Sequence, residues 1–213
     1  MYQYILFDLD GTLTDPEIGI TSSVMHALEK FGIKVEDRSS LRPFIGPPLS
    51  YSFQTYFGLS EEDSELAIKY YRERFSVKGL YENEVYPGVE KLLQELKDSG
   101  KTLIIATSKP EEFTLKILEH FDLLKYFDFV AGATMDGSRG EKADVIRHAL
   151  KISGIEDVSR AIMIGDRKYD ILGAKESGLK SIGVLYGFGD EKELTDAGAD
   201  FVAETVEDII KYI

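Results

Sequence analysis

The sequence predicts an α/β protein in which helices cover a parallel sheet and an all-helical segment is inserted near the start. Three observations carry this prediction. From about residue 86 onward, short apolar runs alternate with amphipathic stretches of helical length, which is typical of a parallel sheet covered on both faces. The interval 16–83 contains no convincing strand. Acidic or hydroxyl residues follow three of the apolar runs, at the strand ends where such sheets bind ligands.

Six apolar runs are the predicted strands. Each run is short and bounded by turn or helix signals, and the first one stops at Asp10-Gly11, as expected of a strand buried on both faces. With helices on each side, this sheet would form a three-layer, Rossmann-like core. The predicted strands are 4–9, 102–107, 127–131, 161–164, 180–185 and, more weakly, 200–203.

The core helices are predicted from apolar residues spaced three and four apart. Pro87-Gly88 introduces the first such stretch, and Ser99-Gly100 ends it, in agreement with the usual start and stop signals. The apolar positions of that stretch are Val89, Leu92, Leu93 and Leu96. Similar stretches predict helices at 112–120, 142–152, 171–177 and 204–213.

The interval 16–83 is predicted to be a helical insertion. Apolar residues from Ile20 to Phe31 share one helical face, and further helices are expected at 49–57 and 61–77. Asp15-Pro16 marks the entry, and Tyr86-Pro87-Gly88 marks the return. The expected domains are 1–15 with 84–213 for the α/β core, and 16–83 for the insertion.

Composition narrows the class of function. The 213 residues are enough for a large domain with a smaller inserted one, and the absence of cysteine excludes disulfides and thiolate chemistry. A formal net charge of −13 opposes binding to nucleic acid. No apolar run approaches the roughly 20 residues of a membrane span, and no basic leader precedes the first strand. We therefore expect a cytoplasmic protein without a nucleic-acid or membrane partner.

Two carboxylates, Asp8 and Asp10, follow the first predicted strand. Because one residue separates them, their side chains leave on the same side if the strand geometry persists. Two like charges this close repel unless a cation or a proton accompanies them. The pair therefore indicates either a bound metal or a division of labour between acid and base, and an ordinary Asp10-Gly11 turn is the alternative.

A threonine occupies the end of the second core strand. Thr107 follows an apolar run and precedes Ser108, which with Glu111 predicts a capping box around Pro110 in the first helical turn. Capping leaves the Thr107 hydroxyl unused. With the free amides of the helix start, this hydroxyl would suit one oxygen of a bound phosphate.

The later strand ends carry further charged residues. Asp166 and Asp170 follow the run 161–164 and lie four residues apart, so they can share one face of a helical turn and supply oxygen ligands to a hard cation. Lys142 opens a predicted helix, where a positive charge opposes the helix dipole. A solvated surface lysine is the alternative for Lys142.

In order along the chain, these residues resemble the four motifs of the haloacid dehalogenase superfamily of phosphatases. The resemblance covers almost the whole sequence. The helical insertion and the stretches 45–49 and 181–187 are similar to those of the phosphoglycolate phosphatase group within it. The matching motifs are Asp8-x-Asp10-Gly11-Thr12, Thr107, Lys142 and Gly165-Asp166-x-x-x-Asp170.

This resemblance implies a Mg²⁺-dependent phosphoric monoester hydrolase that works through an aspartyl-phosphate on Asp8, with Asp10 as general acid and base. It also implies that the insertion is a mobile cap that selects the substrate. The implied metal ligands are Asp8, Asp10 through its backbone carbonyl, Asp166 and Asp170. The implied phosphate-binding residues are Gly11, Thr12, Thr107, Ser108 and Lys142. The cap candidates for specificity are Arg42, Phe44, Gly46 and Tyr51.

Several alternatives stay open at this point. A phosphomutase of the β-phosphoglucomutase type and an inorganic pyrophosphatase would use the same core residues, and phosphoglycolate, nucleoside monophosphates (a 5'-nucleotidase activity) and sugar phosphates are all compatible substrates. A dehalogenase is disfavoured, because a leaving halide needs no proton from Asp10. The non-enzyme alternatives are a receiver-like phospho-acceptor and a catalytically dead binding module. The expected partner is a small phosphorylated metabolite, and the chain is expected to be a monomer, with a homodimer as the alternative.

Overall fold

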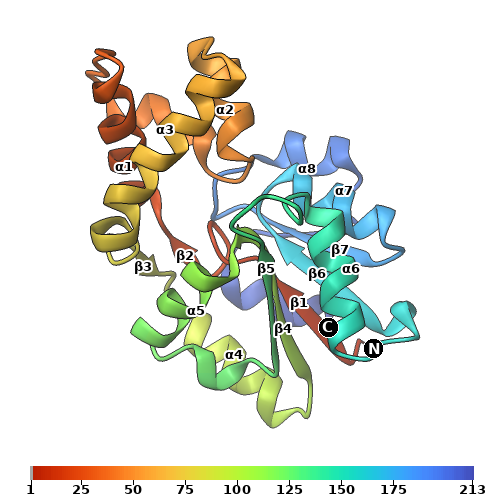
Figure 1. The fold of residues 1–213 in the computed structure, drawn as a ribbon. Helices are drawn as coiled ribbons and strands as arrows, with labels where there is room; N and C mark the ends of the chain where they lie inside the picture. The colour runs from red at the N-terminus through yellow and green to blue at the C-terminus, as the bar shows by residue number, and fades with distance from the viewer. Residues whose placement is uncertain (1) are drawn as a thin grey trace. The chain divides into compact units, whose positions relative to one another are not determined.

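The computed structural model describes residues 2–213 (Figure 1). The chain divides into two compact units. The first unit consists of the N-terminal stretch through Asp15 together with Val85–Ile213, and the second is Pro16–Glu84. Two short strands, β2 (Thr14–Asp15) and β3 (Glu84–Val85), pair where the chain leaves and re-enters the first unit.

The first unit is built on a six-stranded parallel sheet with the order β5-β4-β1-β6-β7-β8. The N-terminal strand lies between β4 and β6, and its last three residues are fully buried. Burial on both faces explains the unbroken apolar run. The strands are β1 (Tyr4–Phe7), β4 (Thr102–Pro110), β5 (Phe129–Ala133), β6 (Ala161–Gly165), β7 (Lys180–Val184) and β8 (Phe201–Ala203).

Helices cover both faces of this sheet, so the predicted three-layer α/β fold is confirmed. Helices α4 and α5 lie on one face and α6, α7 and α8 on the other, as right-handed crossovers would place them. On the second face, α6 packs on β4 and β5 through a core that includes Leu6, Ile104 and Val145. The helices are α4 (Val89–Asp98), α5 (Glu111–His120), α6 (Lys142–Ile152), α7 (Lys168–Glu176) and α8 (Glu191–Ala197).

One local prediction is wrong. The capping box of Ser108 and Glu111 does not form, because β4 continues to Pro110, which pairs with Ala133 of β5 beyond a shift in register. Helix α5 then begins at Glu111, without a side-chain cap. The Glu111 carboxylate instead accepts a hydrogen bond from the backbone N–H of Gly132 (3.2 Å).

The C-terminal part also differs in detail from the prediction. Helix α8 was not predicted from its short and strongly polar sequence, and Asp190 caps it by accepting a hydrogen bond from the Glu193 amide. The last stretch forms a 3-10 helix, Val206–Tyr212, rather than an α-helix. Its capping box joins Thr205 and Asp208.

The second unit is helical, as the absence of strand patterns predicts. Helix α1 (Glu17–Lys30) packs on α3 (Glu61–Arg74), which also contacts α2 (Leu49–Phe57). A 3-10 helix over 38–44 and a π-helical turn over 75–79 complete the unit. Among the described residues, no helix has both the length and the apolar character needed to cross a membrane.

Candidate active site

The candidate site lies at the carboxyl ends of β1, β4 and β6, three neighbouring strands of the sheet. From β1 the chain continues to β4 and then to β5 at one edge of the sheet. It next crosses back to β6, on the other side of β1. Such a reversal opens a crevice for ligands beyond the strand ends. Asp8 is the first residue after β1, and its backbone N–H donates to the Ile164 carbonyl of β6 (2.9 Å).

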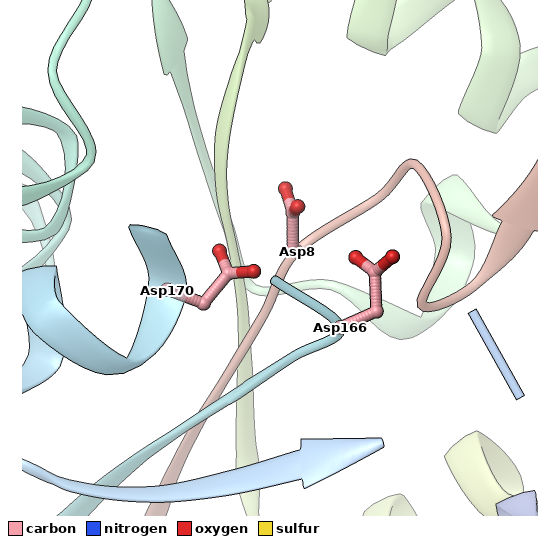
Figure 2. Close-up of side chains that lie close together, drawn as sticks. All are labelled: Asp8, Asp166 and Asp170. Carbon is pink, nitrogen blue, oxygen red and sulfur yellow. The ribbon is translucent and has the colours of Figure 1, made fainter. Parts of the chain in front are cut away.

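Three aspartates converge at this edge (Figure 2). Asp8 follows β1, Asp166 follows β6, and Asp170 lies in the first turn of α7. One carboxylate oxygen from each side chain lies within 4.8 Å of the others, and all three residues are buried. We call these three residues the acidic cluster. Neighbouring parallel strands thus bring Asp8 next to two carboxylates that lie more than 150 positions away in the sequence.

Lys142 supplies positive charge to the acidic cluster. Its Nζ lies 2.8 Å from Oδ1 of Asp8 and 2.7 Å from Oδ1 of Asp170, and it donates to the Ala106 carbonyl (3.1 Å). Lys142 is the first residue of α6 and is buried. The two ion pairs offset the unfavourable position of a lysine at a helix start. The alternative of a solvated surface lysine is therefore wrong.

The buried charges of this site do not balance, since three carboxylates face one ammonium. Burial and the neighbouring Asp170 and Asp8 carboxylates hold the pKa of Asp166 well above its usual range. Burial also raises the pKa of Asp170 to about 6, although Lys142 opposes this. Burial alone would lower the pKa of Lys142, but Asp170 and Asp8 raise it overall. An added cation would stabilise the ionised carboxylates.

The residues of the acidic cluster fit a divalent cation. Oδ2 of Asp166 accepts a hydrogen bond from the Phe188 backbone N–H (2.8 Å). Oδ1 of Asp166 is buried and has no hydrogen-bond partner among the described residues. A buried, unsatisfied carboxylate oxygen is costly, and hard cations such as Mg²⁺ prefer oxygen ligands of this kind.

Three glycines enclose Asp166 tightly. A Cβ at Gly11, where φ is +79°, would lie 2.2 Å from Oδ2 of Asp166, and one at Gly187 would lie 2.4 Å from its Cβ. At Gly189 a Cβ would lie 2.0 Å from the Asp166 carbonyl oxygen. Only glycine leaves room here for the backbone to approach the carboxylate. Gly11, expected among the phosphate-binding residues, therefore packs directly against a candidate metal ligand.

Asp10 occupies a different environment from the acidic cluster. Its Oδ2 lies 2.7 Å from Nζ of Lys109, and both side chains are largely buried. Burial raises the pKa of Asp10, while the Lys109 charge opposes that shift. The Asp10 carboxylate is not one of the three that form the acidic cluster. The two aspartates of the first motif are therefore held by different lysines.

The predicted phosphate-binding hydroxyls lie at the same strand ends. Thr107 is buried, and its Oγ1 accepts a hydrogen bond from the Lys109 backbone N–H (3.2 Å). Ser108 is the next residue of β4 and is partly buried. Thr12 is fully buried, and its carbonyl accepts a hydrogen bond from the Tyr186 hydroxyl (2.9 Å). Phosphate binding by these residues stays a prediction.

The four specificity candidates belong to the second unit. Arg42 forms an ion pair with Glu17 (2.9 Å), and Phe44 is buried, 5.1 Å from the ring of Phe53. Gly46 has a φ of +108°. Tyr51 is 52% exposed, which leaves it available to a ligand. Their role in substrate selection stays a prediction.

Sequence reasoning missed Lys109 and the loop that follows β7. Lys109 lies two residues after Thr107, in the part of β4 where the register with β5 shifts. The incorrect helix start at Ser108 concealed this relation. The stretch 181–187, noted above for its resemblance, leads into this loop, but its contact with Asp166 was not predicted, since it joins segments that lie 22 residues apart.

Comparison with known proteins shows the family of this chain. The profile described as "Haloacid dehalogenase-like hydrolase" matches residues 5–184. The chain belongs to this family.

Individual relatives agree with that placement. A 5'-nucleotidase from Pseudomonas aeruginosa is 48% identical over 91% of this chain and 87% of its own length. The tyrosine-protein kinase PtkA of Mycobacterium tuberculosis is 37% identical, over 99% of this chain and 68% of its own length. The crystal structure of a predicted phosphatase from Clostridium acetobutylicum is 52% identical, with a TM-score of 0.97 over 100% of this chain and 98% of that one. The family match confirms the predicted superfamily, and together with the 5'-nucleotidase and the predicted phosphatase it confirms the predicted class of enzyme, a phosphatase.

The charge imbalance predicts that Asp166→Asn stabilises the metal-free protein. The substitution removes a buried charge and keeps an oxygen that can accept from the Phe188 amide. We expect the free energy of unfolding to rise by about 1 kcal/mol, a Tm increase of roughly 2–4 °C for a chain of this size. Millimolar Mg²⁺ should raise the Tm of the wild type but not of the variant. The control is Asp144→Asn, on the exposed face of α6, which should keep the free energy of unfolding and the Mg²⁺-induced rise in Tm of the wild type. An Asp166→Asn protein that is less stable than the wild type without metal would contradict this prediction.

The same imbalance predicts how stability depends on pH. Because the folded-state pKa of Asp170 is raised to about 6 from an ordinary value of about 3.9, its contribution to stability is complete below about pH 4. That contribution is lost as the pH rises through 6. The Mg²⁺-induced increase in Tm should therefore be larger at pH 7.5 than at pH 5. Equal increases at the two pH values would show that Asp170 does not face the cation.

The glycine enclosure predicts a metal-binding defect in Gly187→Ala. The new methyl group would collide with the Gly11 carbonyl and with Asp166, so the carboxylate must shift. Isothermal titration should show a roughly 10- to 100-fold loss of Mg²⁺ affinity. Gly154→Ala, at a φ of +67° with nothing within 4 Å, should lower the Tm without changing Mg²⁺ affinity. An unchanged Mg²⁺ affinity in Gly187→Ala would show that the loop after β7 does not position Asp166 for the metal.

Proposed function

We propose that this chain is a Mg²⁺-dependent phosphatase that hydrolyses a small phosphomonoester through an aspartyl-phosphate on Asp8. The observation that carries the proposal is the buried acidic cluster at the ends of β1 and β6, with Lys142 bridging Asp8 and Asp170. Family membership supports the same chemistry. A metal or phosphate site without catalysis would not require the second aspartate of the motif, Asp10.

Asp8 is the proposed nucleophile. Its carboxylate attacks phosphorus, and the bond from phosphorus to the leaving oxygen breaks as the acyl phosphate forms. Lys142 keeps positive charge beside Asp8, which reduces the repulsion between two anions as the phosphoryl group approaches. Phosphoryl transfer depends mainly on this kind of positioning and charge neutralisation.

Asp10 is the proposed acid and base. As the phosphoryl group transfers, Asp10 gives a proton to the leaving oxygen, because an alkoxide leaves poorly without one. Asp10 then accepts a proton from the water that attacks the phosphorus of the acyl phosphate, which restores the Asp8 carboxylate and releases inorganic phosphate. Burial, which raises the pKa of Asp10, favours the protonated form needed in the first step.

Asp8, Asp166 and Asp170 are the proposed holders of Mg²⁺, with the backbone carbonyl of Asp10. When bound, the ion would act as a Lewis acid that lowers the negative charge seen by the nucleophile. Asp166 presents an unpartnered oxygen for this purpose, and the Phe188 amide fixes the other one. Thr107 and Lys142 are proposed to bind phosphoryl oxygens.

The helical unit is proposed to choose the leaving group. The chain enters this unit directly after the nucleophile loop, and the core residues recognise only the phosphoryl group. The 5'-nucleotidase relative is more similar to this chain than the phosphoglycolate phosphatases among its relatives, which are 28–32% identical. Nucleoside 5'-monophosphates are therefore the first substrates to test.

Replacing the nucleophile should abolish the reaction. We expect Asp8→Asn to lower the rate of phosphate release from a phosphomonoester, measured with Mg²⁺, at least about a thousandfold, because no acyl phosphate can form. Chelation of Mg²⁺ should silence the wild type in the same assay. The far-UV circular dichroism of the variant should match that of the wild type. More than trace activity in a folded Asp8→Asn protein would contradict the assignment of Asp8 as the nucleophile.

A substrate panel separates the remaining candidates. Phosphate release would be measured with nucleoside monophosphates, phosphoglycolate, pyrophosphate and sugar phosphates, and we expect the highest kcat/KM with a nucleoside 5'-monophosphate. Isomerisation of a sugar phosphate without phosphate release would favour a mutase. Transfer from ATP to a tyrosine peptide, with no release from monoesters, would favour a kinase and contradict the proposal.

A further inference from the structure

A second buried ion pair lies at the same edge of the sheet as the acidic cluster. It joins Nζ of Lys109 to Oδ2 of Asp10 at 2.7 Å, and the two side chains are 5% and 13% exposed. Lys109 does not belong to any of the motifs that define the site. A buried lysine beside the proposed proton donor therefore needs an explanation of its own.

The backbone of β4 is shaped so that Lys109 reaches Asp10. Strand β4 pairs regularly with β5 up to Ala106, and the register then shifts before Pro110. An irregularity of this type bends a strand and redirects its side chains. Within it, the backbone N–H of Lys109 donates to Oγ1 of Thr107. Lys109 is thereby fixed through its backbone as well as through its ammonium group.

Asp10 is restrained from both ends. The turn after β1 holds its backbone, because the Gly11 N–H donates to the Thr14 carbonyl (2.7 Å) and the Leu13 N–H donates to the Leu9 carbonyl (2.9 Å). Lys109 holds Oδ2. The other oxygen, Oδ1, is buried and has no hydrogen-bond partner among the described residues. One oxygen of Asp10 is therefore anchored, and the other is left for a reacting group.

We propose that Lys109 is a positioning residue that anchors Oδ2 of Asp10, so that Oδ1 meets the leaving-group oxygen of the substrate. The inference rests on the proposed phosphatase function. In the step concerned, the bond from phosphorus to the leaving oxygen breaks, and the proton on Oδ1 of Asp10 passes to that oxygen. Lys109 does not touch the reacting atoms. Its contribution is the orientation of the donor, which matters only where a proton must be delivered.

Leaving groups of different basicity test this proposal. An alkyl phosphate needs a proton on its leaving oxygen, whereas p-nitrophenolate leaves without one. The comparison uses kcat/KM, which covers the steps up to loss of the leaving group and omits the later attack of water. We expect Lys109→Met to lower kcat/KM about 10- to 100-fold for alkyl phosphates and less than about threefold for p-nitrophenyl phosphate. General acid groups contribute on the order of 10²–10⁴, so Asp10→Asn should show the same pattern more strongly.

A double-mutant cycle identifies the partner through which Lys109 acts. If Lys109 works only by orienting Asp10, then Lys109→Met should add nothing for alkyl phosphates once Asp10→Asn is present. Equal losses on both kinds of substrate, or losses that multiply in the double variant, would overturn the proposal. Either result would mean that Lys109 supports the fold or the phosphate site in general.

Direct contact of Lys109 with the substrate is the competing explanation. If the ammonium bound an anionic leaving group, Lys109→Met would raise KM for phosphoglycolate and leave a neutral alkyl phosphate unaffected. Orientation of Asp10 instead predicts a lower kcat/KM for both alkyl esters. A loss confined to the carboxylate-bearing ester would therefore overturn the proposal. Lys109→Arg, which keeps the charge, should recover part of the alkyl-phosphate activity.

Controls keep the outcome interpretable. Lys116→Met removes a lysine–carboxylate pair from the exposed side of α5 and should leave kcat/KM unchanged for both the alkyl phosphates and p-nitrophenyl phosphate. The Tm and the Mg²⁺ affinity show whether Lys109→Met is folded; if it is not, Lys109→Gln, which also removes the charge, carries the same comparison. Activity retained in Asp8→Asn would refute the proposed function. A dead Asp8→Asn with equal losses in Lys109→Met would refute this inference alone.

Discussion

The ammonium of Lys142, held against Asp8 and Asp170, is the interaction on which the rest of the site depends. The sheet brings three buried carboxylates within 4.8 Å of one another, an arrangement that repulsion and desolvation oppose. One lysine compensates part of that charge and leaves the remainder for a cation. The protein charges of the site are therefore not balanced, and the surplus of negative charge supports the proposed binding of a cation.

The fold supplies the geometry that this charge arrangement needs. The strand order places β1 between β4 and β6, so side chains from three strand ends meet although they are distant in the sequence. The backbone packs closely around Asp166 at three glycines. Asp8 and Asp10 are then distinguished by their partners, since Lys142 pairs with the first and Lys109 with the second. Two adjacent carboxylates thereby acquire separate environments, as acid and nucleophile roles require.

Much of this arrangement could be predicted from the sequence, and the failures have physical causes. Buried strands can be predicted from apolar runs, and Asp8 and Asp166 lie where two of those runs end. Lys142 was noticeable because its charge opposes the helix dipole. Lys109 was missed because Ser108 and Glu111 resemble a capping box, whereas pairing with β5 extends β4 to Pro110. The loop around Phe188 was missed because tertiary packing, and no local pattern, brings it to Asp166.

Chemical trapping of the phosphorylated residue tests the central claim most directly. The Asp10→Asn variant would be mixed with Mg²⁺ and p-nitrophenyl phosphate, whose leaving group needs no proton, and then quenched with borohydride, which reduces an acyl phosphate to an alcohol. Mass spectrometry of the tryptic peptide that ends at Lys30 should find homoserine in place of Asp8, together with a burst of p-nitrophenolate near one per enzyme. Reduction at a different aspartate, or a full burst with Asp8 intact, would contradict the account.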